Sequence, residues 1–243
     1  MAITIKNEAL FYINETPYNY ENLFKLIKSS TYMEIGKLDF NIFKGVDALT
    51  NQKAAILIFE SSDFKEDLLT DLDCFPQKAT PYSGDRLKYC KGFYKQYLEA
   101  RDLIIKTISE LDVNTIFLTG WSLGGALATI LAVDVKFQFG IKPILITYES
   151  PNPCCNKKTV NHTYESINLD RSVSFINGDD LVPHVAPFPF ARRLKDLDIW
   201  IKFNRKGNLV KKPHFNIIKC ICNIIGFHVN VDETIAKYFQ VKG

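Results

Sequence analysis

The stretch Thr115-Ile-Phe-Leu-Thr-Gly-Trp-Ser-Leu-Gly-Gly-Ala-Leu-Ala128 decides the fold, because it passes from a buried strand through a tight turn into a helix. Residues 115–119 form a short apolar run, which is typical of a strand covered on both faces. Residues 126–139 continue as an apolar helix. Between them lies Gly-x-Ser-x-Gly, whose glycines let a serine occupy a strained strand-to-helix turn. This context predicts a nucleophile elbow with Ser122 as the nucleophile.

Strands and helices alternate on both sides of this stretch. Apolar residues near helical spacing predict a helix within residues 85–111. Continuous apolar runs predict strands over residues 54–59, 143–148 and 172–176. Such alternation is typical of an α/β fold, with a central, mostly parallel sheet flanked by helices. We expect one domain over residues 1–243, with a hairpin near residues 198–210.

Composition narrows the class of protein. The chain has 243 residues, of which 47% are hydrophobic, and a chain of this length buries a sizeable core without disulfides or metals. Its net charge of +3 is too small to imply a nucleic-acid partner. No apolar run is long enough for a transmembrane segment, and the first residues lack a secretory signal. We therefore expect a cytoplasmic location.

Two further compositional features carry weaker signals. The six cysteines form no Cys-x-x-Cys pair, so no metal site is expected, and the missing leader favours free thiols over disulfides. Residues 192–212 are rich in Lys and Arg. This segment could attract an anionic lipid surface, but such runs are more often solvated hairpins.

Residues 119–128 closely resemble the nucleophile region of the class 3 (fungal-type) lipases, with Trp121 where that family usually has histidine. The likeness extends less specifically over residues 50–230. One departure is Glu149, in Tyr148-Glu-Ser-Pro151, where the family usually has glycine. The resemblance implies the α/β-hydrolase fold and a carboxylic ester hydrolase, a lipase or esterase. It further implies a Ser-His-Asp triad, a lipid or other ester as substrate and no cofactor.

The acid of a triad on this fold follows the nucleophile in the chain, and the histidine follows the acid. Residues 175–183 resemble the family's strand that ends in Asp-x-Val-Pro, and this match places the acid at Asp180. Asp179 is then a turn-forming neighbour, although the two roles could be reversed.

The chain offers four histidines as the base. His162 precedes the acid and breaks the expected order, and His184 lies beside Pro183, where a structural role is favoured. His228 follows an apolar stretch and precedes a helix-like segment, as the family's C-terminal histidine does. We therefore expect His228 to be the base, with His214 as the alternative.

Two backbone N–H groups are expected to form the oxyanion hole. The N–H of Leu123 is a natural donor at the start of the helix. Alignment with the family's Phe-Arg-Gly-[Ser/Thr] loop places the second donor at Ser62, with Glu60 and Ser61 replacing Arg and Gly. Residues 63–75 then carry an amphipathic pattern, which fits either a mobile lid or a fixed surface helix.

Four alternative functions stay open at this point. A phospholipase or a short-chain esterase would use the same triad. An acyltransferase would pass the acyl group to an alcohol in place of water. An inactive hydrolase fold would serve as a binding protein, although all three triad residue types are present in the expected order.

Overall fold

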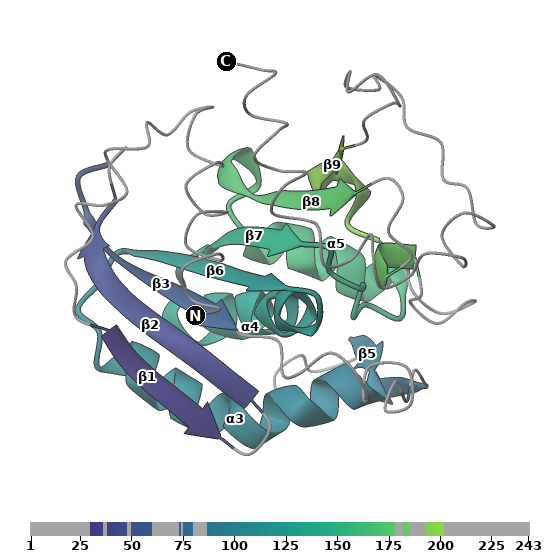
Figure 1. Cartoon of the computed structure of the whole chain (residues 1–243), viewed down its shortest axis with the longest axis horizontal. Helices are drawn as coiled ribbons and strands as arrows, with labels where there is room; N and C mark the ends of the chain where they lie inside the picture. Colours follow the sequence, from purple (N-terminus) through teal and green to yellow (C-terminus); the bar gives the residue numbers. More distant parts are fainter. Residues whose placement is uncertain are drawn as a thin grey trace.

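A computed structural model describes residues 30–35, 38–47, 50–59, 73, 75–79, 87–177, 182–184 and 193–201. Within these ranges, seven strands form one sheet in the order β1-β2-β3-β6-β7-β8-β9 (Figure 1). The strands are β1 (Ser30–Ile35), β2 (Leu38–Val46), β3 (Lys53–Phe59), β6 (Thr115–Trp121), β7 (Ile144–Tyr148), β8 (Val173–Asn177) and β9 (Asp198–Ile201).

The sheet is mostly parallel, as predicted. Strands β3, β6, β7, β8 and β9 pair in parallel, while β1 and β2 add an antiparallel edge. The strand at the start of the expected hairpin is β9, and it pairs with β8; the expected return strand lies outside the described residues. A separate small sheet joins β4 (Pro76–Lys78) to β5 (Lys88–Cys90).

Helices cover the sheet. They are α3 (Lys91–Ser109), α4 (Leu123–Phe139) and α5 (Lys157–Ser166), with short 3-10 turns η2 (Leu169–Arg171), η3 (Val182–His184) and η4 (Lys195–Leu197). Helix α4 packs on β6, β7 and β3, and α3 packs against α4 (Figure 1). Every residue from Leu123 to Val135 is buried, which explains why this helix is apolar on all sides. In the part of the chain that the structure describes, no helix is long and apolar enough to cross a bilayer.

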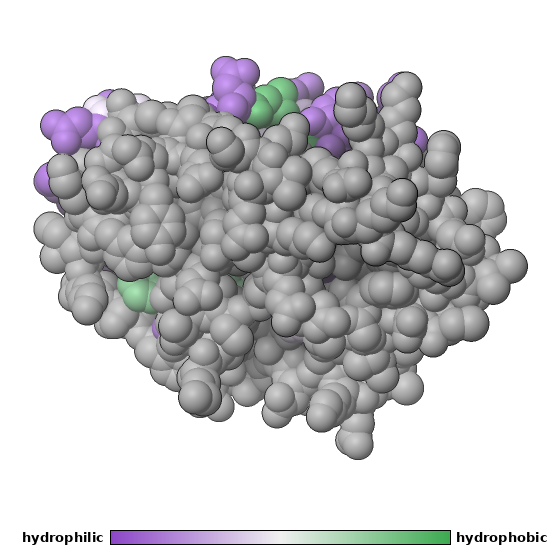
Figure 2. Space-filling view, turned by 45° about the horizontal axis from the view of Figure 1, so that its top comes forward, coloured by the Kyte–Doolittle hydropathy of each residue, from purple (hydrophilic) through white to green (hydrophobic). Residues whose placement is uncertain are grey.

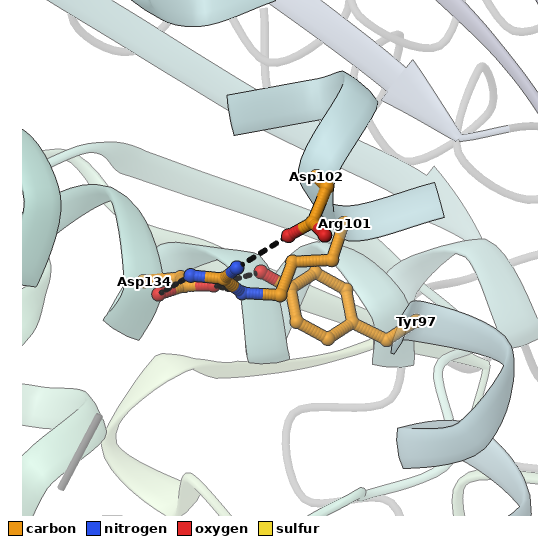
Figure 3. Close-up of polar contacts among 4 residues, drawn as sticks. All are labelled: Tyr97, Arg101, Asp102 and Asp134. Atoms are coloured by element: carbon orange, nitrogen blue, oxygen red, sulfur yellow. Dashed lines mark hydrogen bonds and ion pairs between the residues drawn. The ribbon is translucent and has the colours of Figure 1, made fainter. Parts of the chain in front are cut away.

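A buried polar network joins α3 to α4 (Figure 3). Arg101 Nε lies 2.6 Å from Asp134 Oδ2, and Arg101 Nη2 lies 3.3 Å from Asp134 Oδ1. The hydroxyl of Tyr97 donates to the same carboxylate. Burial, then the neighbouring charge of Asp134, raise the pKa of Tyr97 well above its usual 10. Because each charge has a hydrogen-bonded partner, the network fixes how α3 sits on α4.

The described thiols lie in the interior. Cys90, Cys154 and Cys155 are buried. Burial raises the pKa of the Cys154 thiol to about 12. The sulfurs of Cys90 and Cys155 lie 3.2 Å apart, and this contact lowers the pKa of Cys155. On the face shown in Figure 2, the described side chains at the surface are mostly hydrophilic.

Candidate active site

Ser122 lies at the turn between β6 and α4, with φ 52° and ψ −124°. Its backbone N–H donates to the carbonyl of Tyr148 on β7 (2.9 Å), and its carbonyl accepts from the N–H of Gly125 (3.0 Å). A left-handed φ is costly for a residue with a side chain, and it persists where the surroundings fix it. This is the strand-turn-helix geometry that a nucleophile elbow requires.

Three glycines make this turn possible because the backbone segments approach very closely. A Cβ on Gly120 would lie 2.3 Å from the carbonyl carbon of Gly124, and a Cβ on Gly124 would lie 2.5 Å from the carbonyl oxygen of Phe59 on β3. A Cβ on Gly125 would lie 2.7 Å from the Cβ of Ser150. Close packing therefore explains why glycine occupies the positions on either side of Ser122 in this chain.

Ser122 is buried at the start of helix α4. The residue is 0% exposed, and its Oγ has no hydrogen-bond partner among the described groups. Leu123 begins α4, so its backbone N–H has no acceptor within the helix. No acidic residue occupies the first turn, which leaves the positive end of the helix dipole available to a developing anion.

Glu149 stands beside this turn, at the carboxyl end of β7. It has φ 48°, it is 1% exposed, and its N–H donates to the carbonyl of Phe175 on β8 (2.9 Å). The rings of Tyr148 and Phe175 stack at 5.6 Å between centroids and flank this end of the two strands. No role for Glu149 is predicted from the sequence, where its one distinguishing feature is that it replaces the glycine usual in the resembled family.

The remaining predicted site residues fall outside the described part of the chain. These are Asp180 and its alternative Asp179, His228 and its alternative His214, and the oxyanion donor Ser62. The structure therefore brings together Ser122 and Leu123. Strand β8 ends at Asn177, shortly before Asp180, at the same sheet edge as Ser122.

Other predictions fall on described residues. His162 lies on α5 with its side chain 41% exposed and its Nδ1 3.8 Å from Glu165, so it belongs to the surface. Of the segment 63–75, Asp73 and Phe75 are described: Lys91 bonds to Asp73, while Phe75 is 72% exposed. Elsewhere in the described ranges, no three His, Cys, Asp or Glu side chains gather as a metal site requires.

The parallel sheet, the strained serine and the glycine-packed helix together define the α/β-hydrolase class. A family model described as lipase (class 3) matches residues 56–190, so this chain belongs to the class 3 lipase family.

Two curated relatives are lipases of fungi. The chain is 25% identical to a lipase of Rhizomucor miehei over 160 residues, which cover 63% of this chain and 43% of that protein. It is 26% identical to a secreted mono- and diacylglycerol lipase of Malassezia globosa over 178 residues, covering 72% of this chain and 55% of the relative. The chain thus spans about half the length of these relatives.

Solved structures show the same fold. The Rhizomucor miehei lipase–propeptide complex aligns with a TM-score of 0.59 and 19% identity, covering 97% of this chain and 80% of that one. The lipase of Rhizopus microsporus var. chinensis aligns with a TM-score of 0.57 and 19% identity, covering 98% and 86%. The α/β-hydrolase fold expected from the sequence is confirmed.

The expected cytoplasmic location is wrong in the light of this comparison, because a secreted lipase is among the relatives and points to an extracellular location. That expectation depended on the opening residues and on the lack of a long apolar run, neither of which decides where a chain resides.

Proposed function

We propose that this chain is a serine ester hydrolase that acts on carboxylic esters of lipids. The observation that carries the proposal is the left-handed Ser122, placed at the carboxyl end of a central parallel strand and at the start of a buried helix. Membership of the class 3 lipase family and the lipase relatives support lipid esters as the substrate class.

In the proposed reaction, Ser122 Oγ attacks the ester carbonyl while His228 accepts the hydroxyl proton. His228 then gives that proton to the leaving alcohol, and Asp180 orients the imidazole and stabilises its cation. The N–H groups of Leu123 and Ser62 hold the oxyanion. Water, activated by the same histidine, hydrolyses the acyl-enzyme and restores the free serine.

Structural features support this assignment of roles to the described residues. The Leu123 N–H is the first donor of a helix whose N-terminal turn carries no acid, so it suits an oxyanion. The close glycine contacts fix the serine turn against β3 and α4. A fixed turn places the nucleophile and the oxyanion donor in one geometry before substrate arrives, which reduces reorganisation during reaction.

The test is hydrolysis of p-nitrophenyl esters from acetate to palmitate, with and without lipid vesicles. We expect Ser122→Ala to lower kcat/KM by about a thousandfold or more. Ser109→Ala, at the exposed end of α3, is the matched control and should hydrolyse like the wild type. Equal rates in wild type and Ser122→Ala would overturn the assignment of Ser122.

The acyl-chain profile of the same assay separates the remaining activities. A rate that rises towards palmitate and increases at a lipid interface supports a lipase. A maximum at acetate or butyrate supports an esterase. Adding glycerol or a long-chain alcohol shows acyl transfer if ester product replaces free acid.

A further inference from the structure

Two cysteine side chains meet beside the start of α3. Cys90 ends β5 and is the N-cap of α3, and Cys155 lies in the segment between β7 and α5. Their sulfur atoms are 3.2 Å apart, although the residues are 65 positions apart in the chain. Non-bonded carbon atoms are most stable at about 3.5–4.0 Å, and sulfur is larger than carbon, so the two thiols are in very close contact.

The backbone fixes this contact. The N–H of Cys90 donates to the carbonyl of Pro153, and the N–H of Cys155 donates to the carbonyl of Lys88, each over 2.8 Å. An antiparallel bridge lies between the two hydrogen bonds. Alternate residues of an extended segment point to one face, so the two cysteines are diagonal neighbours on the same face. The pairing register of the two segments therefore brings these thiols together.

A covalent bond between the two sulfurs requires a small movement. Bonded sulfurs lie about 2 Å apart, so these two must approach by roughly 1 Å. Cys90 stands where β5 passes into a helix, and Cys155 directly precedes Asn156, the N-cap of α5. Because each cysteine lies at the end of its extended segment, small side-chain rotations supply the movement without breaking a long ladder.

The neighbouring thiol shows a different setting. Cys154 points to the opposite face, its sulfur lies 3.9 Å from Thr163 Oγ1, and burial raises its pKa to about 12. The pKa of Cys155 is lowered, first by its contact with the Cys90 thiol, against the effect of burial, and then by the charge of Lys88. Since the thiolate is the nucleophile in thiol–disulfide exchange, Cys155 is the better starting point for oxidation.

An extracellular location supplies the conditions for such a bond. A secreted lipase is among the relatives of this chain. Disulfides form and persist in secreted and extracellular proteins and are rare in the cytosol. The expectation that the cysteines stay reduced depended on the missing leader, and the secreted relative removes that ground.

We propose that Cys90 and Cys155 form a disulfide when the chain meets a disulfide oxidant, and that this bond stabilises the part of the fold that carries Ser122. The loop it closes contains α3, β6, α4 and β7, and therefore the whole serine turn. Closing a loop of this length stabilises a fold mainly by restricting the unfolded chain. Both cysteines are buried, which protects the bond from reductants once the chain has folded.

Two exchange steps form the bond. The Cys155 thiolate attacks one sulfur of the oxidant, which gives a mixed disulfide and releases the first thiol of the oxidant. The Cys90 thiol loses its proton to solvent and attacks the Cys155 sulfur, which releases the second thiol. The two cysteines lose two electrons in all, and the oxidant disulfide is reduced to two thiols.

The experiment maps the linkage in the full chain and measures what the linkage contributes. Wild type is equilibrated with mixtures of reduced and oxidised glutathione, its remaining thiols are blocked with iodoacetamide, and the unreduced digest is analysed by mass spectrometry. Thermal unfolding is then compared between oxidised protein and protein kept in a phosphine reductant. The variants are Cys90→Ala and Cys155→Ala, and the matched control is Cys154→Ala, a buried cysteine on the opposite face.

We expect one species in which the Cys90 and Cys155 peptides are linked and which separates after reduction. Oxidised wild type should unfold at a temperature higher by roughly 5–15 °C than reduced wild type. Cys90→Ala and Cys155→Ala should lose that difference, because neither can close the loop. Cys154→Ala should keep it, even if the lost methylene and sulfur packing lowers both midpoints.

The mapping decides the inference even where a variant fails to fold, because it is made on the wild type. Absence of the linked species under oxidising conditions, or a link from either residue to another cysteine, would overturn the inference. A linked species that unfolds at the same temperature as reduced wild type would overturn the stabilising role. None of these readouts uses ester hydrolysis, so the result is independent of the function proposed for Ser122.

Discussion

At the scale of single residues, the serine turn depends on close backbone-to-backbone contacts at glycines. Gly120 and Gly124 lie where the backbones of β6, α4 and β3 meet, and a Cβ on either would overlap backbone atoms at 2.3 and 2.5 Å. Backbone atoms cannot swing away as the end of a long side chain can. Any side chain here therefore pushes the start of α4 away from β3, and the Leu123 N–H moves with it.

We predict that Gly124→Ala lowers the free energy of unfolding by about 1–3 kcal/mol. It should also reduce ester hydrolysis, because the displaced helix start carries the proposed oxyanion donor. Urea denaturation followed by circular dichroism measures the first effect. The control is Gly140→Asn at the end of α4, where φ is +70° and nothing lies within 4 Å; asparagine tolerates this conformation at a cost below about 1 kcal/mol. Equal losses for both variants would contradict this account.

The two residues with positive φ at this sheet edge, Ser122 and Glu149, differ in how far the sequence predicts them. Gly-x-Ser-x-Gly between an apolar strand and an apolar helix predicted the left-handed Ser122 turn, because local chain geometry is enough to require it. The positive φ of 48° at Glu149 has no local sequence signal; in the structure the Glu149 N–H donates to the carbonyl of Phe175 on the neighbouring strand β8. Only the departure from the glycine of the resembled family drew attention to it.

At the scale of elements, α3 and α4 are coupled through the Arg101–Asp134 ion pair and the Tyr97 hydroxyl (Figure 3). Helix α4 begins at the serine turn, and α3 packs against its outer side. The network thus supports the helix that orients the candidate site.

We predict that Asp134→Ala lowers the free energy of unfolding by about 3–5 kcal/mol, because Arg101 is left buried without its main partner. The double variant Arg101→Met/Asp134→Leu should recover most of that loss, since apolar side chains restore packing. Chemical denaturation of the three proteins measures both effects. Removing the exposed Lys53–Asp112 pair is the control and should leave the unfolding midpoint unchanged. A double variant as unstable as Asp134→Ala would refute the electrostatic explanation.

Strands could be predicted from the sequence where a continuous apolar run marks them. The apolar runs at 54–59, 143–148 and 172–176 became β3, β7 and β8 with small shifts at their ends. Residues 88–90 fell inside the expected helix but form β5, because pairing with β4 and contact with Cys154 override helical periodicity. Strands β1 and β2 were missed, although each pairs with its neighbour in the chain, as Ile35 with Leu38 and Val46 with Lys53. Polar residues such as Asp39 and Asn41 interrupt β2, so it offers no continuous apolar run.

At the scale of the whole molecule, buried phenols couple stability to pH. Burial raises the pKa of Tyr89 and of Tyr97 well above 10. The unfolded chain releases these protons near pH 10, whereas the folded chain keeps them. Unfolding therefore becomes more favourable as the pH rises above 10, and stability below that pH is unaffected by these groups.

We predict that these tyrosines leave the thermal unfolding midpoint nearly unchanged between about pH 8 and 9.5. At higher pH, their ionisation in the unfolded chain should lower the midpoint. Scanning calorimetry across pH 8–11 measures it. The fall should be shallower in Tyr89→Phe, which has no phenolic proton to release. A Tyr89→Phe curve parallel to that of the wild type would remove Tyr89 from this explanation.

The central position of β6 affects when the serine turn forms as a newly synthesised chain folds. Its neighbours β3 and β7 pair with it across long stretches of sequence, as Ala54 with Thr115 shows, and such non-local parallel pairings form slowly. The serine turn depends on both neighbours, because it bonds to Tyr148 and packs under Phe59. A chain still in the course of folding therefore has no formed nucleophile. Ester hydrolysis by Ser122, as proposed, is therefore expected only once β3, β6 and β7 have paired.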